Sequence, residues 1–118
     1  MKIETSTGEA ITLTFAQCRI LLRAILREEA CGSPLSLIYE SGCSFPRRET
    51  ITAEALVRKG LLKRVRKGEP RRSETGCYLT RPGTTYSISD YRVTDEGYWQ
   101  GDALRAYFRE QRARAKAL

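Results

Sequence analysis

Apolar and polar positions alternate roughly with period two over residues 2 to 13, on either side of Gly8. Period two places successive side chains on opposite faces of a strand, and β-branched residues such as Ile3 and Ile11 favour that conformation. The pattern predicts a short strand or hairpin at the N-terminus. At Thr14 the period changes, and apolar residues then recur at steps of three and four, the spacing of one helix face.

The first predicted helix begins at Thr14 and ends near Ala30. Thr14 and Gln17 match a capping box, in which each side chain bonds the backbone N–H of the other residue. Leu13 and Cys18 can pack together beside this cap, which fixes where the chain enters the helix. The apolar face of the helix is expected to comprise Phe15, Cys18, Leu21, Leu22, Ile25 and Leu26.

A second, shorter helix is predicted after Gly32, which interrupts the helical spacing. Ser33 supplies an N-cap, and Pro34 suits the first position of a helix, where its missing N–H costs no hydrogen bond. Apolar residues continue as far as Gly42, so we expect this helix to end there.

A third helix is predicted from about Pro46 to Gly60. Its apolar side is expected at Ile51, Ala55 and Leu56, and Gly60 suits the residue that follows a helix. The β-branched residues in its first turns weaken helix propensity, so the helix has more than one possible start.

Residues 61 to 93 are expected to form a β-hairpin with an elaborated tip. Apolar and basic residues alternate over residues 61 to 67, as in a strand with one solvated face. Short alternating segments return on either side of a turn at Pro82 and Gly83.

The composition indicates one folded domain. The chain has 118 residues, of which 41% are hydrophobic and 30% charged, and this balance gives no sign of disorder. The longest apolar stretches are only a few residues long, and the N-terminus lacks the hydrophobic block of a secretory signal. We therefore expect a cytoplasmic protein that does not associate with membranes.

The cysteines and the lack of histidine limit the chemistry. Cys18, Cys31, Cys43 and Cys77 are widely spaced, and no histidine is present to complete a zinc site. We expect reduced cysteines buried as small apolar residues, and no metal or cofactor. Without histidine, Ser-His and Cys-His catalysis is excluded, and the sequence has no phosphate-binding glycine motif. We therefore do not expect an enzyme, although chemistry assembled from distant positions stays open.

Positive charge is concentrated in one segment. Residues 46 to 92 contain 12 Lys and Arg against 5 Asp and Glu, whereas the segments on either side are nearly neutral. Eight of these basic residues lie within residues 58 to 72. Such a density opposes compaction unless a polyanion compensates it, and neutralising DNA phosphates releases counterions. Nucleic acid is therefore the first partner that the sequence indicates.

Two segments in this frame resemble winged helix-turn-helix regulators. Residues 55 to 64, ALVRKGLLKR, resemble the end of the recognition helix and the first wing strand of MarR-, PadR- and ArsR-like proteins. Residues 91 to 97, YRVTDEG, resemble the second wing strand and the start of the helix that follows it. The resemblance implies an α+β winged helix-turn-helix domain. Its parts would be a three-helix core (14–60), a wing (61–93) and a C-terminal helix (94–118). The wing is longer and richer in arginine than is typical.

The resemblance also implies a DNA-binding site. The third helix would lie in the major groove and the wing along the backbone or minor groove of double-stranded DNA, as expected for a transcriptional regulator. Arg47 and Arg48 are the predicted base or phosphate readers. The expected helix contacts are Ser44, Arg47, Arg48, Thr50 and Glu54, and the expected wing contacts are Lys63, Arg64, Arg66, Lys67, Arg71, Arg72 and Arg81.

The last helix is predicted to begin after a Thr94 cap and to support a homodimer. Aromatic and aliphatic residues at helical spacing fit either the core or a dimer contact. Two-fold symmetry would present two recognition helices to a palindromic site. The candidate dimerisation residues are Trp99, Leu104, Tyr107 and Phe108.

Two other binding functions fit the same sequence. A winged-helix module can bind protein instead of DNA, for example as a small inhibitor that occludes another macromolecule. Single-stranded nucleic acid is a further alternative, although Tyr78 and Tyr86 alone make a thin platform for stacking bases.

Overall fold

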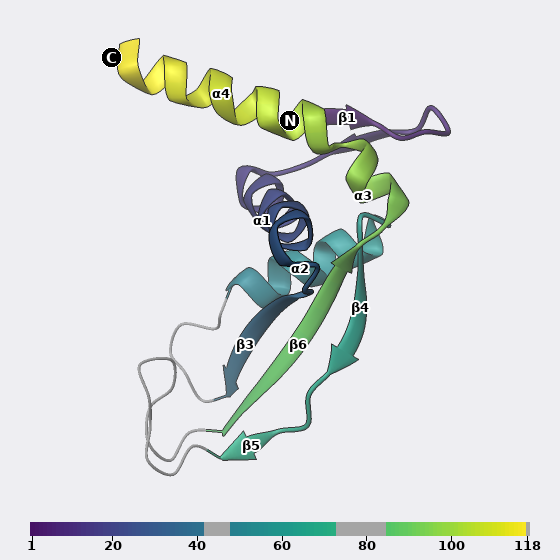
Figure 1. The fold of residues 1–118 in the computed structure, drawn as a ribbon, viewed down its shortest axis with the longest axis vertical. Helices are drawn as coiled ribbons and strands as arrows, with labels where there is room; N and C mark the ends of the chain where they lie inside the picture. The colour runs from purple at the N-terminus through teal and green to yellow at the C-terminus, as the bar shows by residue number, and fades with distance from the viewer. Residues whose placement is uncertain (42–47, 73–84, 118) are drawn as a thin grey trace.

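The computed structural model describes the backbone of residues 1–41, 48–72 and 85–117, and the side chains of these ranges except 39–41, 48 and 71–72. It is an α+β structure, which confirms the predicted class (Figure 1). No helix in the described ranges is both long and apolar enough to cross a bilayer. The elements in chain order are β1 (Lys2–Glu4), β2 (Ala10–Thr12), α1 (Phe15–Cys31), β3 (Leu35–Ser41), α2 (Arg48–Arg58), β4 (Leu62–Lys67), β5 (Arg71–Arg72), β6 (Thr85–Val93), α3 (Asp95–Trp99) and α4 (Gly101–Ala117).

The N-terminal hairpin is confirmed. Strands β1 and β2 are antiparallel with Ile3 opposite Ile11, and Gly8 has a φ of 84°, which favours glycine. The Met1 ammonium donates a hydrogen bond to the Leu13 carbonyl oxygen over 2.9 Å. This bond holds the end of the hairpin beside the start of α1.

Helix α1 follows the prediction at both ends. The Thr14 Oγ1 accepts from the Gln17 N–H over 3.1 Å, and the Gln17 Oε1 accepts from the Thr14 N–H over 3.1 Å. Gly32 ends the helix in the left-handed conformation. Two residues of the predicted apolar face differ, since Phe15 and Leu26 are 51% and 46% exposed.

The predicted second helix is wrong, because residues 35–41 form strand β3. Leu35 and Leu37 are buried and Ser36 is exposed, which is a period-two pattern. The strand pairs with β6 along its whole length, from Leu35 opposite Tyr91 onward. These long-range hydrogen bonds outweigh the local helix signal. The predicted three-helix core of residues 14–60 therefore becomes two helices and a strand within the described residues.

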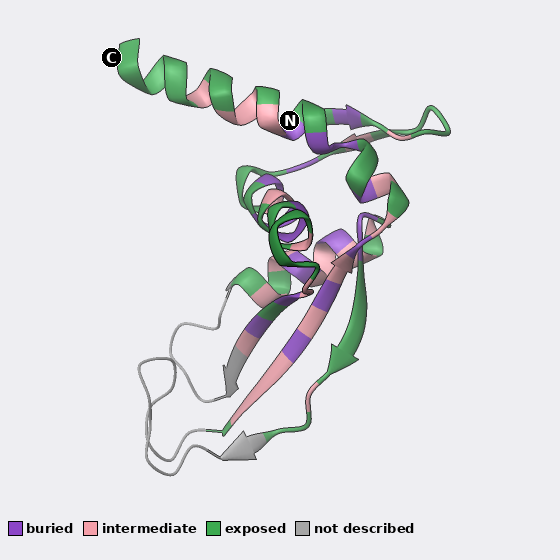
Figure 2. Ribbon diagram, viewed as in Figure 1, coloured by how far each residue is buried: buried purple, intermediate pink, exposed green. Residues whose placement is uncertain are grey.

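The predicted hairpin over residues 61–93 is confirmed. Strand β6 is antiparallel to β4 on one side and to β3 on the other, and the short β5 also pairs with β6. Ser89, Tyr91 and Val93 on β6 are buried and alternate with intermediate residues, whereas β4 is almost entirely exposed (Figure 2). The predicted turn at Pro82 and Gly83 lies outside the described residues.

Helix α2 uses a different face from the predicted one. Ala53 and Leu56 are completely buried, whereas Ile51 is 56% exposed and Ala55 is intermediate. The helix packs against α1 and the sheet, and Gly60, with φ 78°, follows its end. The predicted apolar side was therefore wrong for Ile51 and correct for Leu56.

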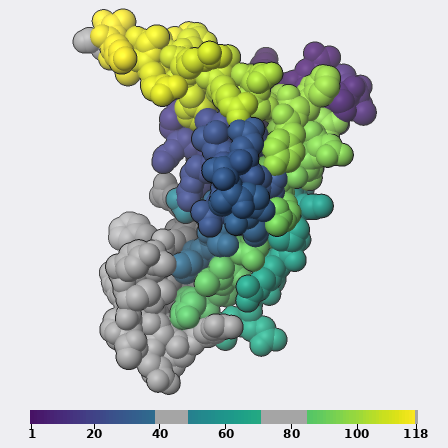
Figure 3. All heavy atoms as spheres, in the orientation of Figure 1, coloured from purple at the N-terminus to yellow at the C-terminus, as the bar shows by residue number. Residues whose placement is uncertain are grey.

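The C-terminal helix is divided into α3 and α4 at Gln100. Thr94 caps α3 as predicted, accepting a hydrogen bond from the Gly97 N–H over 3.1 Å. A Cβ atom at Gly97 would collide with the carbonyl oxygen of Leu61, so glycine allows α3 to lie against the start of β4. Helix α4 crosses α1, and its last turns extend beyond the rest of the molecule (Figures 1 and 3).

Candidate nucleic-acid interface

Strand β4, at one side of the sheet, presents a basic surface. The strand begins at the buried Leu62, and the five residues that follow it are all exposed. Four of these five are Lys63, Arg64, Arg66 and Lys67. The predicted wing therefore places its cations in solvent along one strand.

An irregularity at Val65 controls how these cations are distributed. Arg64 is opposite Tyr91, but Arg66 is opposite Asp90, the very next residue back along β6. Val65 is thus the extra residue of a β-bulge. Beyond a bulge, the alternation of side chains between the two faces of a sheet changes phase.

The bulge places Arg64 and Lys67 on the same face of the sheet. Directly paired residues project from the same face, and Lys67 is opposite Ser89. Tyr91 and Ser89 are two residues apart on β6, so they share a face with their partners. This is the face on which α2 packs, because Glu54 of α2 contacts Arg64 and Tyr91.

Arg64 is exposed, but it is held by a hydrogen-bond network that reaches the buried Tyr91. The Glu54 Oε1 accepts from the Arg64 Nη1 over 2.9 Å and from the Tyr91 hydroxyl over 2.8 Å. Tyr91 is completely buried, and burial together with the Glu54 carboxylate raises the pKa of Tyr91 to about 12. The neutral hydroxyl therefore orients Glu54 towards Arg64.

The other three cations of β4 differ in their partners. Arg66 is 4.0 Å from Asp90, which also accepts a hydrogen bond from the Ser36 hydroxyl over 2.6 Å. Among the residues that the structure describes, Lys63 and Lys67 have no ion-pair partner. The two lysines are therefore the strand cations available to an external anion.

A cavity of about 460 Å³ lies between α2 and the hairpin. It has two cations and several hydroxyls, and the Thr50 Oγ1 is buried with no hydrogen-bond partner among the described residues. A buried hydroxyl without a partner is costly, and an anionic oxygen would satisfy it. The described lining residues are Thr50, Glu54, Arg64, Lys67, Pro70, Thr85, Tyr86, Ser87 and Ser89.

The structure brings six of the predicted contacts to this region. Thr50, Glu54, Arg64 and Lys67 line the cavity, and Lys63 and Arg66 lie on the same strand, β4. Glu54 is occupied by its internal contacts. Ser44, Arg47 and Arg81 lie outside the described residues. Only the backbones of Arg48, Arg71 and Arg72 are described, in α2 and β5.

Sequence reasoning missed the polar residues of β6. Ser87 and Ser89 line the cavity, and Tyr91 supports its Glu54. These three residues alternate along one strand, and that period-two polar pattern was the available signal. On α2, Ile51 and Arg58 are exposed. Thr50 and Glu54, which were predicted to face the DNA, are only partly exposed.

The predicted dimerisation residues have different surroundings. Trp99 is 66% exposed, whereas Leu104 is completely buried within its own chain and belongs to the core. The Tyr107 and Phe108 rings pack against Phe15, with ring centroids 6.5 and 5.6 Å away. Trp99 is therefore the candidate with the most free surface.

The described cysteines are free thiols with different environments. Cys18 is buried as predicted, and burial raises the pKa of its thiol. The prediction was wrong for Cys31, which is exposed, and hydrogen bonds from Ser33 lower the pKa of its thiol. No group of three potential metal ligands occurs within the described ranges.

Comparison of the chain with protein-family models, with curated proteins and with solved structures found no match. The functional argument therefore depends on the charges, hydroxyls and packing described above.

Proposed function

We propose that the chain binds double-stranded DNA, with the β4–β6 hairpin as its main contact to the phosphate backbone. The observation that carries this proposal is the exposed cationic strand β4, on which Lys63 and Lys67 have no ion-pair partner among the described residues. Lys67 projects from the face of the sheet on which α2 packs, and Lys63, opposite Arg92, projects from the other face. The two lysines therefore flank the exposed strand, where free cations can replace counterions condensed on a phosphate backbone. The expected function is that of a winged-helix transcriptional regulator.

The cavity beside the hairpin supports a phosphate contact in particular. Lys67 would supply the charge, and Thr50 and Ser87 would supply hydroxyl donors to a phosphate oxygen. A phosphate held there would bring α2 close to the duplex. The solvent side of α2 would then meet base edges, where Arg58 can bond guanine and Ile51 can contact a thymine methyl group.

A simpler explanation of the basic strand is protection against aggregation. Lysine and arginine on an edge strand prevent it from pairing with strands of other molecules. This explanation requires no DNA. It does not account for the buried Thr50 hydroxyl in the cavity, which has no partner among the residues described in the structure.

The test is fluorescence anisotropy with a labelled random-sequence duplex at about 50 mM and about 200 mM salt. We expect affinity to fall steeply with salt. The double variant Lys63→Ala with Lys67→Ala should bind more weakly and lower the salt slope by about 2, since each phosphate contact contributes about 0.9. The matched control is Arg114→Ala with Lys116→Ala, which removes the same charge from the end of α4.

Two results would reject the proposal. One is no binding at low salt, which favours the protein-binding alternative. The other is an equal loss of affinity in the variant and its control, because net charge alone would then explain binding. Homodimerisation on a palindromic site remains a separate proposal, and a purified protein that sediments only as a monomer at high concentration would exclude it.

A further inference from the structure

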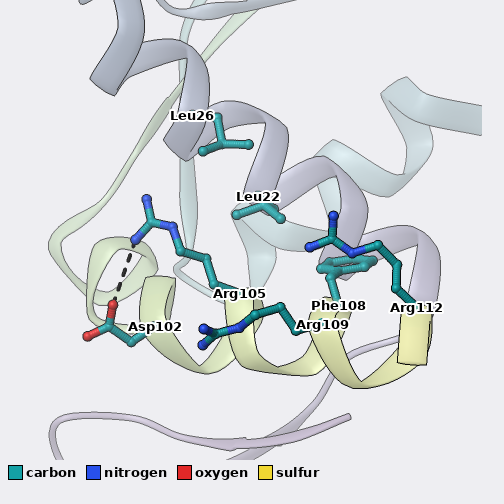
Figure 4. Close-up of a pocket in the computed structure, with 7 residues that line it drawn as sticks. All are labelled: Leu22, Leu26, Asp102, Arg105, Phe108, Arg109 and Arg112. Carbon is teal, nitrogen blue, oxygen red and sulfur yellow. Dashed lines mark ion pairs between the residues drawn. The ribbon is translucent and has the colours of Figure 1, made fainter. Parts of the chain in front are cut away.

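A second candidate surface lies at the other end of the molecule, in a groove between α1 and α4. Figure 4 shows Leu22 and Leu26 from α1 and Phe108 from α4 with arginine side chains around them. The groove has a volume of about 730 Å³. Leu26 is 46% exposed, so much of this apolar surface contacts solvent. The lining residues are Leu22, Leu26, Asp102, Arg105, Phe108, Arg109 and Arg112.

The three arginines of the groove are not equivalent. Arg105 is 2.6 Å from the Glu29 carboxylate and 3.7 Å from that of Asp102, so the chain itself neutralises it. Within the described part of the chain, neither Arg109 nor Arg112 has a carboxylate partner. The groove thus combines an apolar floor with two uncompensated positive charges on one side.

The lining of the groove fits one side of an amphipathic helix. The groove lies where α4 crosses α1, and α4 continues past the body of the molecule (Figure 1). An amphipathic helix binds such a groove through apolar residues at positions i, i+3 or i+4, and i+7. The exposed Leu26 and the half-buried Leu22 and Phe108 would receive those residues.

We propose that this groove binds an amphipathic helix with an acidic side, supplied by another protein. The apolar side of that helix would cover the leucines of α1, and its carboxylates would pair with Arg109 and Arg112. Charge complementarity argues against a second copy, because two-fold packing through the groove brings basic residues towards their own copies and the net charge of the chain is +7. The apolar floor argues against DNA.

The test uses a labelled designed helix with leucines at the apolar positions and glutamates beside them, added to the isotope-labelled full chain. We expect the NMR signals of Leu22, Leu26 and Phe108 to shift. The charge reversal Arg109→Glu with Arg112→Glu should weaken binding by about tenfold or more. Leu26→Glu should do the same, and its exposure makes misfolding an unlikely cause, which circular dichroism checks.

The controls separate this site from general attraction between opposite charges. Arg114→Glu with Lys116→Glu makes the same charge change on α4 outside the groove, and we expect less than about a twofold effect. A peptide with lysine in place of glutamate should not bind. Signal shifts confined to β4 and β6, equal losses in the two charge reversals, or binding of the lysine peptide would each overturn the proposal. Sedimentation as a dimer that Arg109→Glu dissociates would assign the groove to a second copy and overturn it as well.

Discussion

Strand β4 and the α1–α4 groove are both rich in basic residues, but they differ in which of those residues form ion pairs with carboxylates of the same chain. On β4, carboxylates from α2 and β6 lie beside Arg64 and Arg66. In the groove, Glu29 and Asp102 neutralise Arg105 and leave Arg109 and Arg112 without partners in the described residues. Strand β4 has the denser positive charge in sequence. However, each region keeps two basic residues without an ion-pair partner in the described residues, Lys63 and Lys67 on β4 and Arg109 and Arg112 in the groove.

The floors of the two surfaces differ as well. The cavity beside β4 is lined by several hydroxyls and the Glu54 carboxylate, and the Thr50 hydroxyl has no hydrogen-bond partner in the ranges that the structure describes. The groove is floored by Leu22, Leu26 and Phe108. Hydroxyls and lysines suit phosphate oxygens, whereas leucines beside arginines suit an amphipathic partner. This difference is the reason for proposing a different class of ligand at each end of the molecule.

Gly97→Ala is expected to have the largest effect, because Gly97 allows α3 to lie directly against the start of β4. The added Cβ would collide with the Leu61 carbonyl oxygen, and backbone on both sides limits relaxation. We expect the free energy of unfolding to fall by about 3 kcal/mol, despite a gain in helix propensity of about 1 kcal/mol. Urea unfolding followed by circular dichroism measures it.

Gly101→Ala is the matched control for that substitution. A Cβ at Gly101 meets its nearest atoms at 3.7 and 4.0 Å, which is ordinary contact. The free energy of unfolding should stay the same or rise by up to about 1 kcal/mol. Equal destabilisation by both alanines would show that the close approach to Leu61 is not the cause.

Tyr91→Phe sharpens the comparison by removing the hydroxyl that orients Glu54. Near neutral pH we expect a loss of about 1 kcal/mol in the free energy of unfolding. Folding raises the pKa of Tyr91 from its ordinary 10 to about 12, so the folded state favours the protonated form. The resulting stability is present below pH 10 and is lost as the pH rises towards 12.

The measurement is urea unfolding of both proteins at about pH 8 and about pH 11. The wild type should lose more stability than the variant over this interval. Tyr107→Phe serves as the control, because no hydrogen bond to its hydroxyl is found within the described residues. A variant with the same alkaline loss as the wild type would exclude Tyr91 as the source.

Glu54→Gln tests whether the chain's own carboxylate restrains the hairpin. Glutamine keeps a hydrogen-bonding side chain but removes the charge that holds Arg64. If DNA binds the hairpin, affinity should rise by about threefold at low salt, roughly 0.7 kcal/mol. Glu49→Gln makes the same charge change on α2, at a carboxylate that pairs with Arg23. A similar rise in DNA affinity for that variant would show that the change in net charge, and not the release of Arg64, causes the effect.

Leu26→Ser is expected to have the smallest effect on stability. Leu26 is 46% exposed, so the free energy of unfolding should change by no more than about 0.5 kcal/mol. The same substitution should leave the DNA affinity unchanged. A loss of several kcal/mol would mean that the groove is part of the core and not a binding surface.

The elements with local signals were predictable from the sequence. The capping box of Thr14 and the Thr94 cap depend on neighbouring residues, and both form as expected. Strand β3 was not predicted, because its conformation depends on pairing with β6 some fifty residues away. The exposed Ile51 was missed for a related reason: the burial of a helix face depends on which element packs against it.

The candidate site was predictable only in part. The density of basic residues located the hairpin, since composition is visible in the sequence. It did not show that Glu54 and Asp90 would approach Arg64 and Arg66, because those contacts depend on the fold. The sequence also predicted Thr50 and Glu54 on the exposed side of α2, but both are only partly exposed, whereas Ile51 of the predicted apolar side is 56% exposed.

The bulge at Val65 has a consequence for how this gene can change. Loss of that single codon would remove the unpaired residue and leave Arg66 and Lys67 opposite Asp90 and Ser89 as before. Loss of a codon from the facing part of β6 would instead shift every later pair by one step and reverse the sides of their side chains. We therefore expect an in-frame deletion at 65 to keep the pairing of β4 with β6, and a deletion in β6 to disrupt it.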